Sequence, residues 1–275
     1  MKQSSQDVET FFLQKKGLKT RISPKVFPNV TTVFESMRTY EGHIFLLSEH
    51  LERLQRSANT IGLSLPATRE ELFGFVLDSF KTSQKKEAFL RLTVAADAVW
   101  LFVAPAKTYP SDIYQKGVRV AFSAVRRNVS MSAFPEAKSS SYLNGVLARI
   151  ENQEAHEILY LDAGGYAAEG LISNLFVVRD GALQTPFATG ILNGLTRDFV
   201  IKLALSMGIP VHETRLTRHD IYNAEEAFLT YSSGELVPIR EVDGRQIGTH
   251  CPGTMTSQLH QRFGDEVKKI IRQPK

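Results

Sequence analysis

The feature that most constrains the fold is the alternation of short strand-forming runs with amphipathic helical segments. Apolar residues recur with the period of a helix in some segments and with the period of a strand in others. This alternation predicts an α+β protein. The chain has 275 residues, 43% of them hydrophobic and 23% charged, which excludes a disordered, collagen-like or coiled-coil chain and allows two domains with separate cores.

The N-terminal part of the pattern predicts one compact α+β domain. The expected elements are a hairpin over residues 26–45, helices over 47–61 and 69–80, and strands over 88–94 and 99–103. Ser48 is expected to cap the first helix, and Gly62 to end it. We expect residues 1–106 to form a smaller N-terminal domain and residues 107–117 to link it to the next.

The remaining residues, 118–275, are expected to form a larger C-terminal α+β domain. Its expected elements are strands over 118–125, 157–162, 172–179, 182–185, 226–231 and 237–242 and helices over 142–154, 196–207 and 220–223. The short strands are separated by glycine-containing turns, which favours an antiparallel meander within this domain.

Charge and cysteine content limit the partners. The net charge is only +4 and the basic residues are dispersed, which favours anionic small molecules over nucleic acid. The single cysteine, Cys251, cannot form an internal disulfide or a multi-thiolate metal site, so we expect a reducing, cytoplasmic setting and no metal. No membrane segment or export signal is expected, because the most hydrophobic stretch, residues 88–106, is interrupted by charges.

Three separate segments have the chemistry to bind an anion. Gly194 and Thr196 open an apolar helix whose first N–H groups could face an anion, with Thr196 able to cap the helix. Residues 231–234, Tyr-Ser-Ser-Gly, follow an apolar strand and offer hydroxyl and backbone donors. Arg53 lies beside the apolar stripe of the first helix, whereas Arg56 points away. Taken singly, each is more simply a capped helix, a serine turn and a solvated arginine.

Two further residues need a chemical reason if they are buried. Glu169 lies among small residues in GGYAAEGLISN, where a buried carboxylate depends on a specific partner. Lys138 lies between a proline-containing loop and a helix, where desolvation could make its neutral amine available as a nucleophile. For either residue considered alone, a surface charge is the commoner outcome.

Several segments, in order, resemble the class IV aminotransferases, the fold-type IV pyridoxal phosphate enzymes with a two-domain, D-amino acid aminotransferase-like fold. The similar segments are FESMRTYEG, FLLSEHLERLQRSA, KSSSYLNGVLAR, AAEGLISNLFVVRDGALQTP, GILNGLTRDFVIKLA and EEAFLTYSSGELVPI. They extend from about Phe34 to Ile239, and their common order makes the resemblance specific.

The resemblance implies pyridoxal 5′-phosphate as cofactor and a role for each residue singled out above. It implies that Lys138 binds the cofactor covalently and acts as the catalytic base, and that Glu169 pairs with the pyridine nitrogen. It implies that Tyr142 lies near the cofactor and that the phosphate is held by Arg53, Leu195, Thr196, Ser232 and Ser233. The resemblance also implies a homodimer acting on a small-molecule amine.

The resemblance leaves the reaction open. The phrases around Lys138, AEGLISN and FESMR are most similar to 4-amino-4-deoxychorismate lyase, which releases pyruvate and 4-aminobenzoate in folate biosynthesis. The alternative is an amino-acid transaminase of branched-chain or D-amino acid type using 2-oxoglutarate. A non-catalytic binder of phosphorylated ligands is disfavoured because it would need neither Lys138 nor Glu169. The segments before Phe34 and after Arg91 depart from the family pattern, so no substrate residue is carried over.

Overall fold

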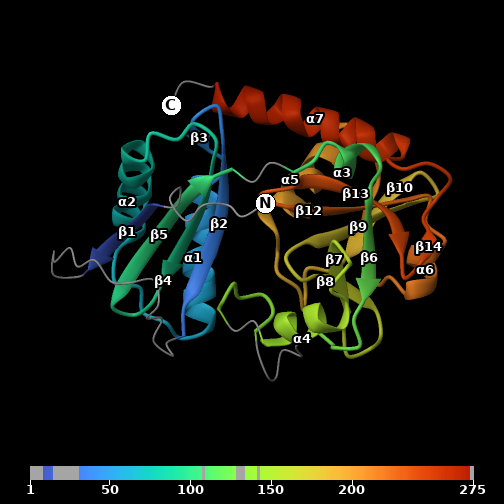
Figure 1. Cartoon of the computed structure of the whole chain (residues 1–275), viewed down its shortest axis with the longest axis horizontal. Helices are drawn as coiled ribbons and strands as arrows, with labels where there is room; N and C mark the ends of the chain where they lie inside the picture. The colour runs from blue at the N-terminus through green and yellow to red at the C-terminus, as the bar shows by residue number, and fades with distance from the viewer. Residues whose placement is uncertain (1–8, 15–30, 107–108, 128–133, 141–142, 273–275) are drawn as a thin grey trace. The chain divides into compact units, whose positions relative to one another are not determined.

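The computed structural model describes residues 9–14, 31–106, 109–127, 134–140 and 143–272, which fold into two compact units (Figure 1). Unit 1 comprises Met1–Lys107, Ala137–Ser141 and Ile271–Lys275, and unit 2 comprises Thr108–Glu136 and Tyr142–Ile270. Each unit contains helices and a sheet, so the predicted α+β class is confirmed. No helix in the described parts of the chain has the length and apolarity needed to cross a bilayer.

The division into units differs from the domain boundaries expected from the sequence at residues 137–141 and 271–275, which cluster with unit 1. Hydrogen bonding explains the first of these segments. The backbone N–H of Phe34 donates to the carbonyl of Lys138 at 3.0 Å, and Val33 forms an isolated bridge with Ser139. The segment that carries Lys138 is therefore attached to a strand about one hundred residues earlier in the chain.

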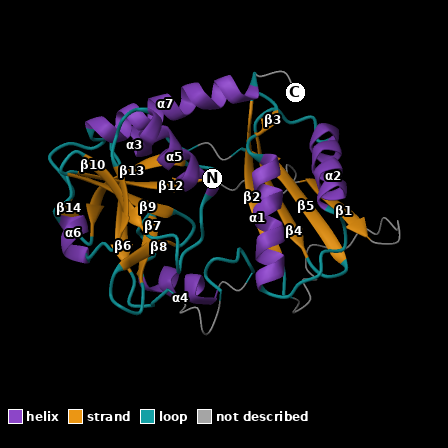
Figure 2. Cartoon of the chain, turned by 180° about the vertical axis from the view of Figure 1, so that it is seen from behind, coloured by secondary structure: helices purple, strands orange, loops and turns teal. Residues whose placement is uncertain are grey.

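Unit 1 is an antiparallel sheet with two helices on one face, as Figures 1 and 2 both show. Its elements are β1 (Glu9–Gln14), β2 (Val33–Tyr40), β3 (His43–Ile44), α1 (Leu47–Thr60), α2 (Arg69–Thr82), β4 (Ala88–Val94) and β5 (Ala98–Pro105). The strand order is β1-β5-β4-β2-β3, and every pair is antiparallel. The hairpin predicted around Glu41 and Gly42 is the β2–β3 pair, whereas residues 26–30 of the expected first strand lie outside the described residues.

The two helices of unit 1 begin in different ways. Helix α2 has the capping box that its sequence allows, with reciprocal hydrogen bonds between Thr68 and Glu71. Helix α1 begins one residue earlier than expected, after Leu46, which adopts a left-handed conformation and makes no side-chain cap. Ser48 is therefore inside the helix, and its predicted capping role is wrong. Burial of the apolar stripe of α1 against the sheet, not a cap, holds this helix in place.

Unit 2 is built on a larger mixed sheet. Its elements are α3 (Asp112–Gln115), β6 (Val118–Phe122), α4 (Leu143–Glu151), β7 (Glu157–Leu161), β8 (Ala167–Gly170), β9 (Asn174–Arg179), β10 (Ala182–Pro186), α5 (Leu195–Ser206), β11 (Val211–Thr214), α6 (Arg218–Tyr222), β12 (Glu226–Tyr231), β13 (Glu235–Val242), β14 (Arg245–Gln246) and α7 (Thr254–Ile271). The strand order is β11-β10-β9-β12-β13-β6-β7-β8, with β14 paired to β13. The terminal strand β8 also approaches β9 and β10, so the sheet curls back on itself.

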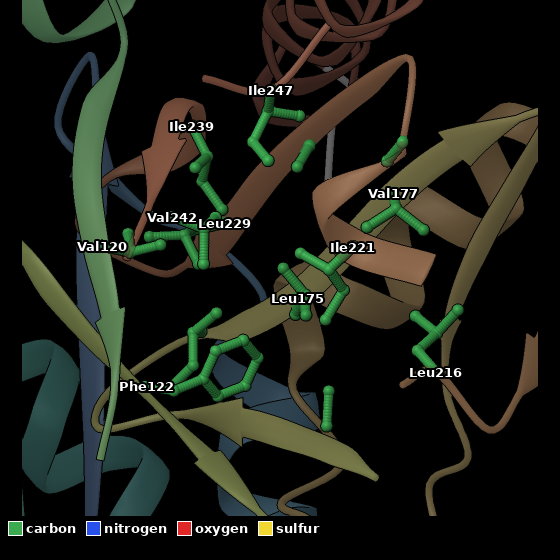
Figure 3. Close-up of a cluster of buried hydrophobic side chains, with 14 of the residues drawn as sticks. Val120, Phe122, Leu175, Val177, Leu216, Ile221, Leu229, Ile239, Val242 and Ile247 are labelled. Atoms are coloured by element: carbon green, nitrogen blue, oxygen red, sulfur yellow. The ribbon is translucent and has the colours of Figure 1, made fainter. Parts of the chain in front are cut away.

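The curled sheet encloses the main core of unit 2 (Figure 3). Side chains labelled there come from both halves of the sheet and from the segments that cover it, among them Phe122, Leu175, Leu229 and Ile239. On the opposite side of the central strands, Phe176 and Phe228 stack with ring centroids 5.0 Å apart, and both rings are fully buried. The sheet is therefore packed on both faces, which fits the nearly continuous burial along β9 and β12.

Helix α4 differs from the other helices in where its apolar side lies. Leu143, Val146, Leu147 and Ile150 were expected to share one side, and the structure leaves them 69%, 55%, 45% and 62% exposed. Only small residues of this helix are buried. A run of four exposed apolar side chains on one short helix is unusual for a surface that meets only water.

Two leucines of helix α5 give a matched test of the unit 2 core. Leu203 is 5% exposed and Leu205 is 56% exposed on the same helix. We expect Leu203→Ala to lower the free energy of unfolding by about 2–5 kcal/mol, because it leaves a cavity, and Leu205→Ala to change it by less than about 0.5 kcal/mol. Urea denaturation of both variants measures the difference. Equal effects would contradict the packing described for α5.

Candidate active site

A buried ionic cluster fixes Arg53 in unit 1. The Nε and Nη2 atoms of Arg53 donate to the two oxygens of Glu35 at 2.8 and 2.7 Å, and His50 Nδ1 lies 2.7 Å from Glu35 Oε2. All three side chains are almost completely buried. Helix α1 supplies Arg53 and His50, and strand β2 supplies Glu35. A bidentate grip on one edge of the guanidinium fixes the direction of its other edge.

The protonation states in this cluster follow from burial and charge. Burial alone raises the pKa of Glu35, but the charge and hydrogen bonds of Arg53, together with His50, outweigh burial and lower the pKa from 4.5 to about 2. Burial lowers the pKa of His50, although Glu35 opposes this change. Near neutral pH the cluster therefore contains an ionised Glu35, a charged Arg53 and a neutral His50.

Lys138 lies against the same helix. Its backbone N–H donates to Ser57 Oγ at 3.0 Å, and Ser57 is on α1, one turn after Arg53. The Nζ atom of Lys138 is 4.8 Å from the centroid of the Phe34 ring, and the guanidinium carbon of Arg91 is 3.8 Å from the same centroid. Two cationic side chains thus meet one aromatic ring, so a negatively charged group near Lys138 would also be attracted to Arg91.

In unit 2, Glu169 is a buried carboxylate with several donors. Arg127 Nε donates to Glu169 Oε1 at 2.6 Å, and the backbone N–H of Leu192 donates to Oε2 at 3.1 Å. Asn174 Nδ2 is 3.4 Å from the same oxygen and donates to the carbonyl of Leu192 at 2.9 Å. These bonds join Glu169, on β8, to the loop that precedes helix α5.

The start of α5 lacks a side-chain cap. Gly194 is the N-cap residue, Leu195 and Thr196 are the first two helical residues, and no side chain caps the helix. The expectation that Thr196 caps it is therefore wrong, because Thr196 lies inside the first turn. A Cβ at Gly194 would collide with Asn174 Oδ1, so only glycine allows this approach. The first N–H groups of the helix have no intrahelical acceptor and can face an anion.

A buried arginine holds this helix start against the sheet. Arg197 is 1% exposed, and its Nη2 atom donates to the carbonyl of Pro186 at 2.9 Å and to Glu213 Oε2 at 2.6 Å. Pro186 ends β10 and Glu213 lies on β11. The direction of the α5 N-terminus is thus set by strands on the neighbouring part of the sheet.

The Ser232–Ser233 turn follows β12, the strand on which α5 packs. The N–H of Gly234 donates to the carbonyl of Tyr231 at 3.0 Å, and a Cβ at Gly234 would collide with the Tyr231 ring. Ser233 Oγ is 3.2 Å from the hydroxyl of Tyr109. The glycine allows a tight turn whose serine residues present hydroxyl and backbone donors.

The structure places the predicted site residues in two groups. Arg53 and Lys138 meet around α1 in unit 1, and Glu169 is joined by hydrogen bonds to the loop before Leu195 and Thr196 in unit 2. Tyr142 lies outside the described residues. The sequence analysis missed the partners that orient these residues, namely Glu35, His50, Ser57, Arg91, Arg127, Asn174 and Arg197. Only the charged residues within apolar or small-residue segments gave a signal for them.

Comparison with known proteins gives a consistent result. A family model described as amino-transferase class IV matches residues 32–242. A relative from Methanocaldococcus jannaschii, provisionally named a branched-chain-amino-acid aminotransferase, is 38% identical over 247 residues, covering 85% of this chain and 86% of its own. The branched-chain-amino-acid aminotransferase of Pseudomonas aeruginosa is 32% identical over 256 residues, covering 86% of this chain and 83% of its own.

Solved structures agree with these relatives. A branched-chain amino acid aminotransferase from the organism abbreviated T.th., solved with pyridoxamine 5′-phosphate, has a TM-score of 0.83 at 30% identity, covering 89% of this chain and 87% of its own. The same T.th. protein is also solved with N-(5′-phosphopyridoxyl)-L-glutamate and with 4-methylvaleric acid. The similarity extends over most of both chains, so it includes both units described above.

The ionic cluster of unit 1 predicts a pH dependence of stability. Because burial lowers the pKa of His50 below 6.5, the unfolded chain binds a proton that the folded chain excludes, and stability falls as the pH drops below 6.5. The slope is at most about 1.4 kcal/mol per pH unit. Glu35 adds a separate loss only below pH 4.5, which is complete as the pH falls through about 2.

We expect His50→Gln to flatten the fall in stability between pH 6.5 and about pH 5, because glutamine does not titrate. Urea denaturation at several pH values measures this slope for each protein. The exposed His43, on β3, gives the matched control variant His43→Gln. An unchanged slope in His50→Gln would show that His50 does not carry the dependence.

Proposed function

The chain belongs to the class IV aminotransferase family, and from this premise we propose that it is a pyridoxal 5′-phosphate-dependent transaminase of branched-chain amino acids that uses 2-oxoglutarate as acceptor. The observation that carries the proposal is the full-length similarity to relatives named for this reaction, together with a lysine, a buried carboxylate and a fixed arginine in the matched region. The expectation of an aminodeoxychorismate lyase in folate biosynthesis finds no support among these relatives. They favour the transaminase alternative.

The residues on both units fit the proposed cofactor in kind. An aldehyde needs an amine, and Lys138 provides one; a phosphate needs fixed cations and N–H donors, and Arg53 and the α5 N-terminus provide them. A pyridine nitrogen needs an acidic partner, and Glu169 is a buried carboxylate. Gly194 leaves the space at the helix start that a Cβ would fill. When bound, the cofactor supplies an electron-accepting ring that stabilises negative charge on the substrate carbon.

In this proposal Lys138 has two tasks at one atom. Its Nζ holds the cofactor covalently, and after the substrate amine has displaced it, the same Nζ takes the proton from the amine-bearing carbon. The hydrogen bonds of the Lys138 backbone to Phe34 and Ser57 keep this residue on the unit 1 framework. A base that is held on a rigid sheet and helix can return to the same position in each turnover.

The cations of unit 1 support an anionic substrate. Arg91 contacts the Phe34 ring that Lys138 also contacts, so a carboxylate of the amino acid is attracted to the place where its amine must react. Arg53 is held by Glu35 with one edge of its guanidinium, and we assign the phosphate to the other edge. Leu195, Thr196, Ser232 and Ser233 would add N–H and hydroxyl donors from unit 2.

We extend the proposal to a homodimer. Its support is the exposed apolar side of α4, formed by Leu143, Val146, Leu147 and Ile150, which a second copy could cover. Light scattering of the purified protein measures the oligomeric state. A monomer at micromolar concentration would remove this part of the proposal without affecting the reaction.

The reaction is tested with two substrate sets. We expect leucine, isoleucine or valine to react with 2-oxoglutarate to give glutamate, with no turnover when the keto acid is omitted. Aminodeoxychorismate should be left unchanged. Release of pyruvate and 4-aminobenzoate without any keto acid would instead restore the lyase interpretation. Lys138→Ala is the inactive control for both assays.

Two arginines of α1 test the phosphate assignment. Arg53 is buried, whereas Arg56 is exposed on the same helix. We expect Arg53→Lys to weaken pyridoxal 5′-phosphate binding roughly tenfold to a hundredfold, because lysine cannot keep both the Glu35 grip and a contact of about 1.5–3 kcal/mol with the phosphate. Arg56→Lys is the matched control and should bind normally. Equal affinities in equilibrium titrations would remove Arg53 from the site.

A further inference from the structure

We propose that Arg127 is a positioning residue that keeps Glu169 ionised and in one orientation, so that the proton shared with a pyridine nitrogen stays on the nitrogen. The inference rests on the proposed function and adds a residue that no sequence signal identified. It concerns unit 2 alone, where Arg127 and Glu169 both lie.

The contact between the two side chains is short and sheltered. Arg127 Nε donates to Glu169 Oε1 at 2.6 Å, and the side chains of Arg127 and Glu169 are 22% and 6% exposed. Arg127 Nη2 also donates to the carbonyl of Pro135 at 3.1 Å, so the guanidinium is held at two points. The bond to Glu169 thus has a defined direction, and the charge interaction is only weakly screened by water.

The two oxygens of Glu169 have different partners. Oε1 accepts from the charged Arg127, whereas Oε2 accepts from the neutral donors Leu192 N–H at 3.1 Å and Asn174 Nδ2 at 3.4 Å. A charge-assisted bond is stronger than a neutral one, so Arg127 makes the largest contribution among these three donors to holding the carboxylate.

The consequence for a pyridine nitrogen follows from acid–base chemistry. A carboxylate and a pyridine that share a proton in a buried place have similar basicities, so a nearby charge decides which of them carries the proton. A cation bonded to the carboxylate lowers its affinity for the proton. Arg127 therefore favours the arrangement with a protonated nitrogen and an ionised Glu169, which is the form that accepts electrons from the substrate.

Arg127 also anchors the chain that leads to Lys138. Its Nη2 atom binds the carbonyl of Pro135, Lys138 is the third residue after Pro135, and Glu136 Oε1 accepts from Gly190 N–H at 2.9 Å. One guanidinium thus contacts the carboxylate proposed for the nitrogen and the segment that precedes the proposed base. A purely structural role would follow from the Pro135 bond alone, so the test must separate the two contacts.

The surroundings of Arg127 allow such a test. Arg127 lines a pocket of about 520 Å³, whose wall also includes Ala167, Ala168 and residues 189–191. A small cation added to the solution can reach the position of a deleted guanidinium through this pocket. Arg127→Ala with added guanidinium ion therefore restores a charge next to Glu169 without restoring the covalent side chain.

The experiment uses the protein loaded with pyridoxal 5′-phosphate that carries ¹⁵N in its ring. The ¹⁵N chemical shift of the ring nitrogen reports whether that nitrogen is protonated, and it does not require turnover. The variants are Arg127→Lys, Arg127→Gln and Arg127→Ala with and without guanidinium ion. Arg179→Gln is the matched control, because Arg179 pairs with Asp220 at 2.5 Å in the same unit with similar exposure.

We expect the ring nitrogen to be protonated in the unsubstituted protein, in Arg127→Lys and in Arg179→Gln, and to lose protonation in Arg127→Gln. The turnover number of Arg127→Gln should fall roughly tenfold or more, with a smaller change in KM, because a charge-assisted bond that acts after substrate binding is lost. Guanidinium ion should restore both the ¹⁵N shift and turnover in Arg127→Ala.

An unchanged ¹⁵N shift in a folded Arg127→Gln protein would overturn the proposal, as would rescue of turnover without rescue of the shift. Circular dichroism identifies a variant that fails to fold, and Arg127→Ala with guanidinium ion then decides the matter. If the unsubstituted protein binds no pyridoxal 5′-phosphate, the proposed function fails instead. The two failures are therefore distinguishable.

Discussion

Keeping carboxylates ionised in the interior is the constraint on which both halves of this protein depend. Glu35 is completely buried and yet has its pKa lowered to about 2, which is possible only because Arg53 and His50 bind both of its oxygens. The same bonds connect strand β2 to helix α1 and fix the direction of Arg53 before any ligand arrives. In unit 2, Arg127 plays the corresponding part for Glu169 and connects β8 to the segment before Lys138.

The sequence predicted the order and type of most elements because their apolar periods are strong. It failed where local chemistry and tertiary packing disagree. Ser48 is a good capping residue, yet α1 begins after Leu46, because burial of the apolar stripe decides where the helix starts. Helix α7 and strands β1, β8 and β11 had not been predicted, and the last two are only four residues long. The apolar side of α4 was predicted, but periodicity cannot tell which surface such a side will meet.

The candidate site was predicted in part for a related reason. Arg53, Lys138 and Glu169 stand out as charges within apolar or small-residue segments, and the family resemblance gave each a role. Their orienting partners on other elements lie 18 to 81 residues away along the chain, so no local pattern joins them. The reaction was harder still. Lyase and transaminase begin with the same proton removal at the same lysine, so the residues that sequence reasoning could identify do not separate them.

The placement of residues 137–141 within unit 1 has a consequence for how the protein is made. A ribosome releases the chain from its N-terminus, and strands β2, β4 and β5 emerge before the segment that bridges Val33 to Ser139. Unit 1 therefore cannot close during synthesis until part of unit 2 has already been released. Its last contact, between Glu41 and Arg272, comes later still. The lysine proposed for the chemistry is thus held by a joint that forms only after both units have begun to fold.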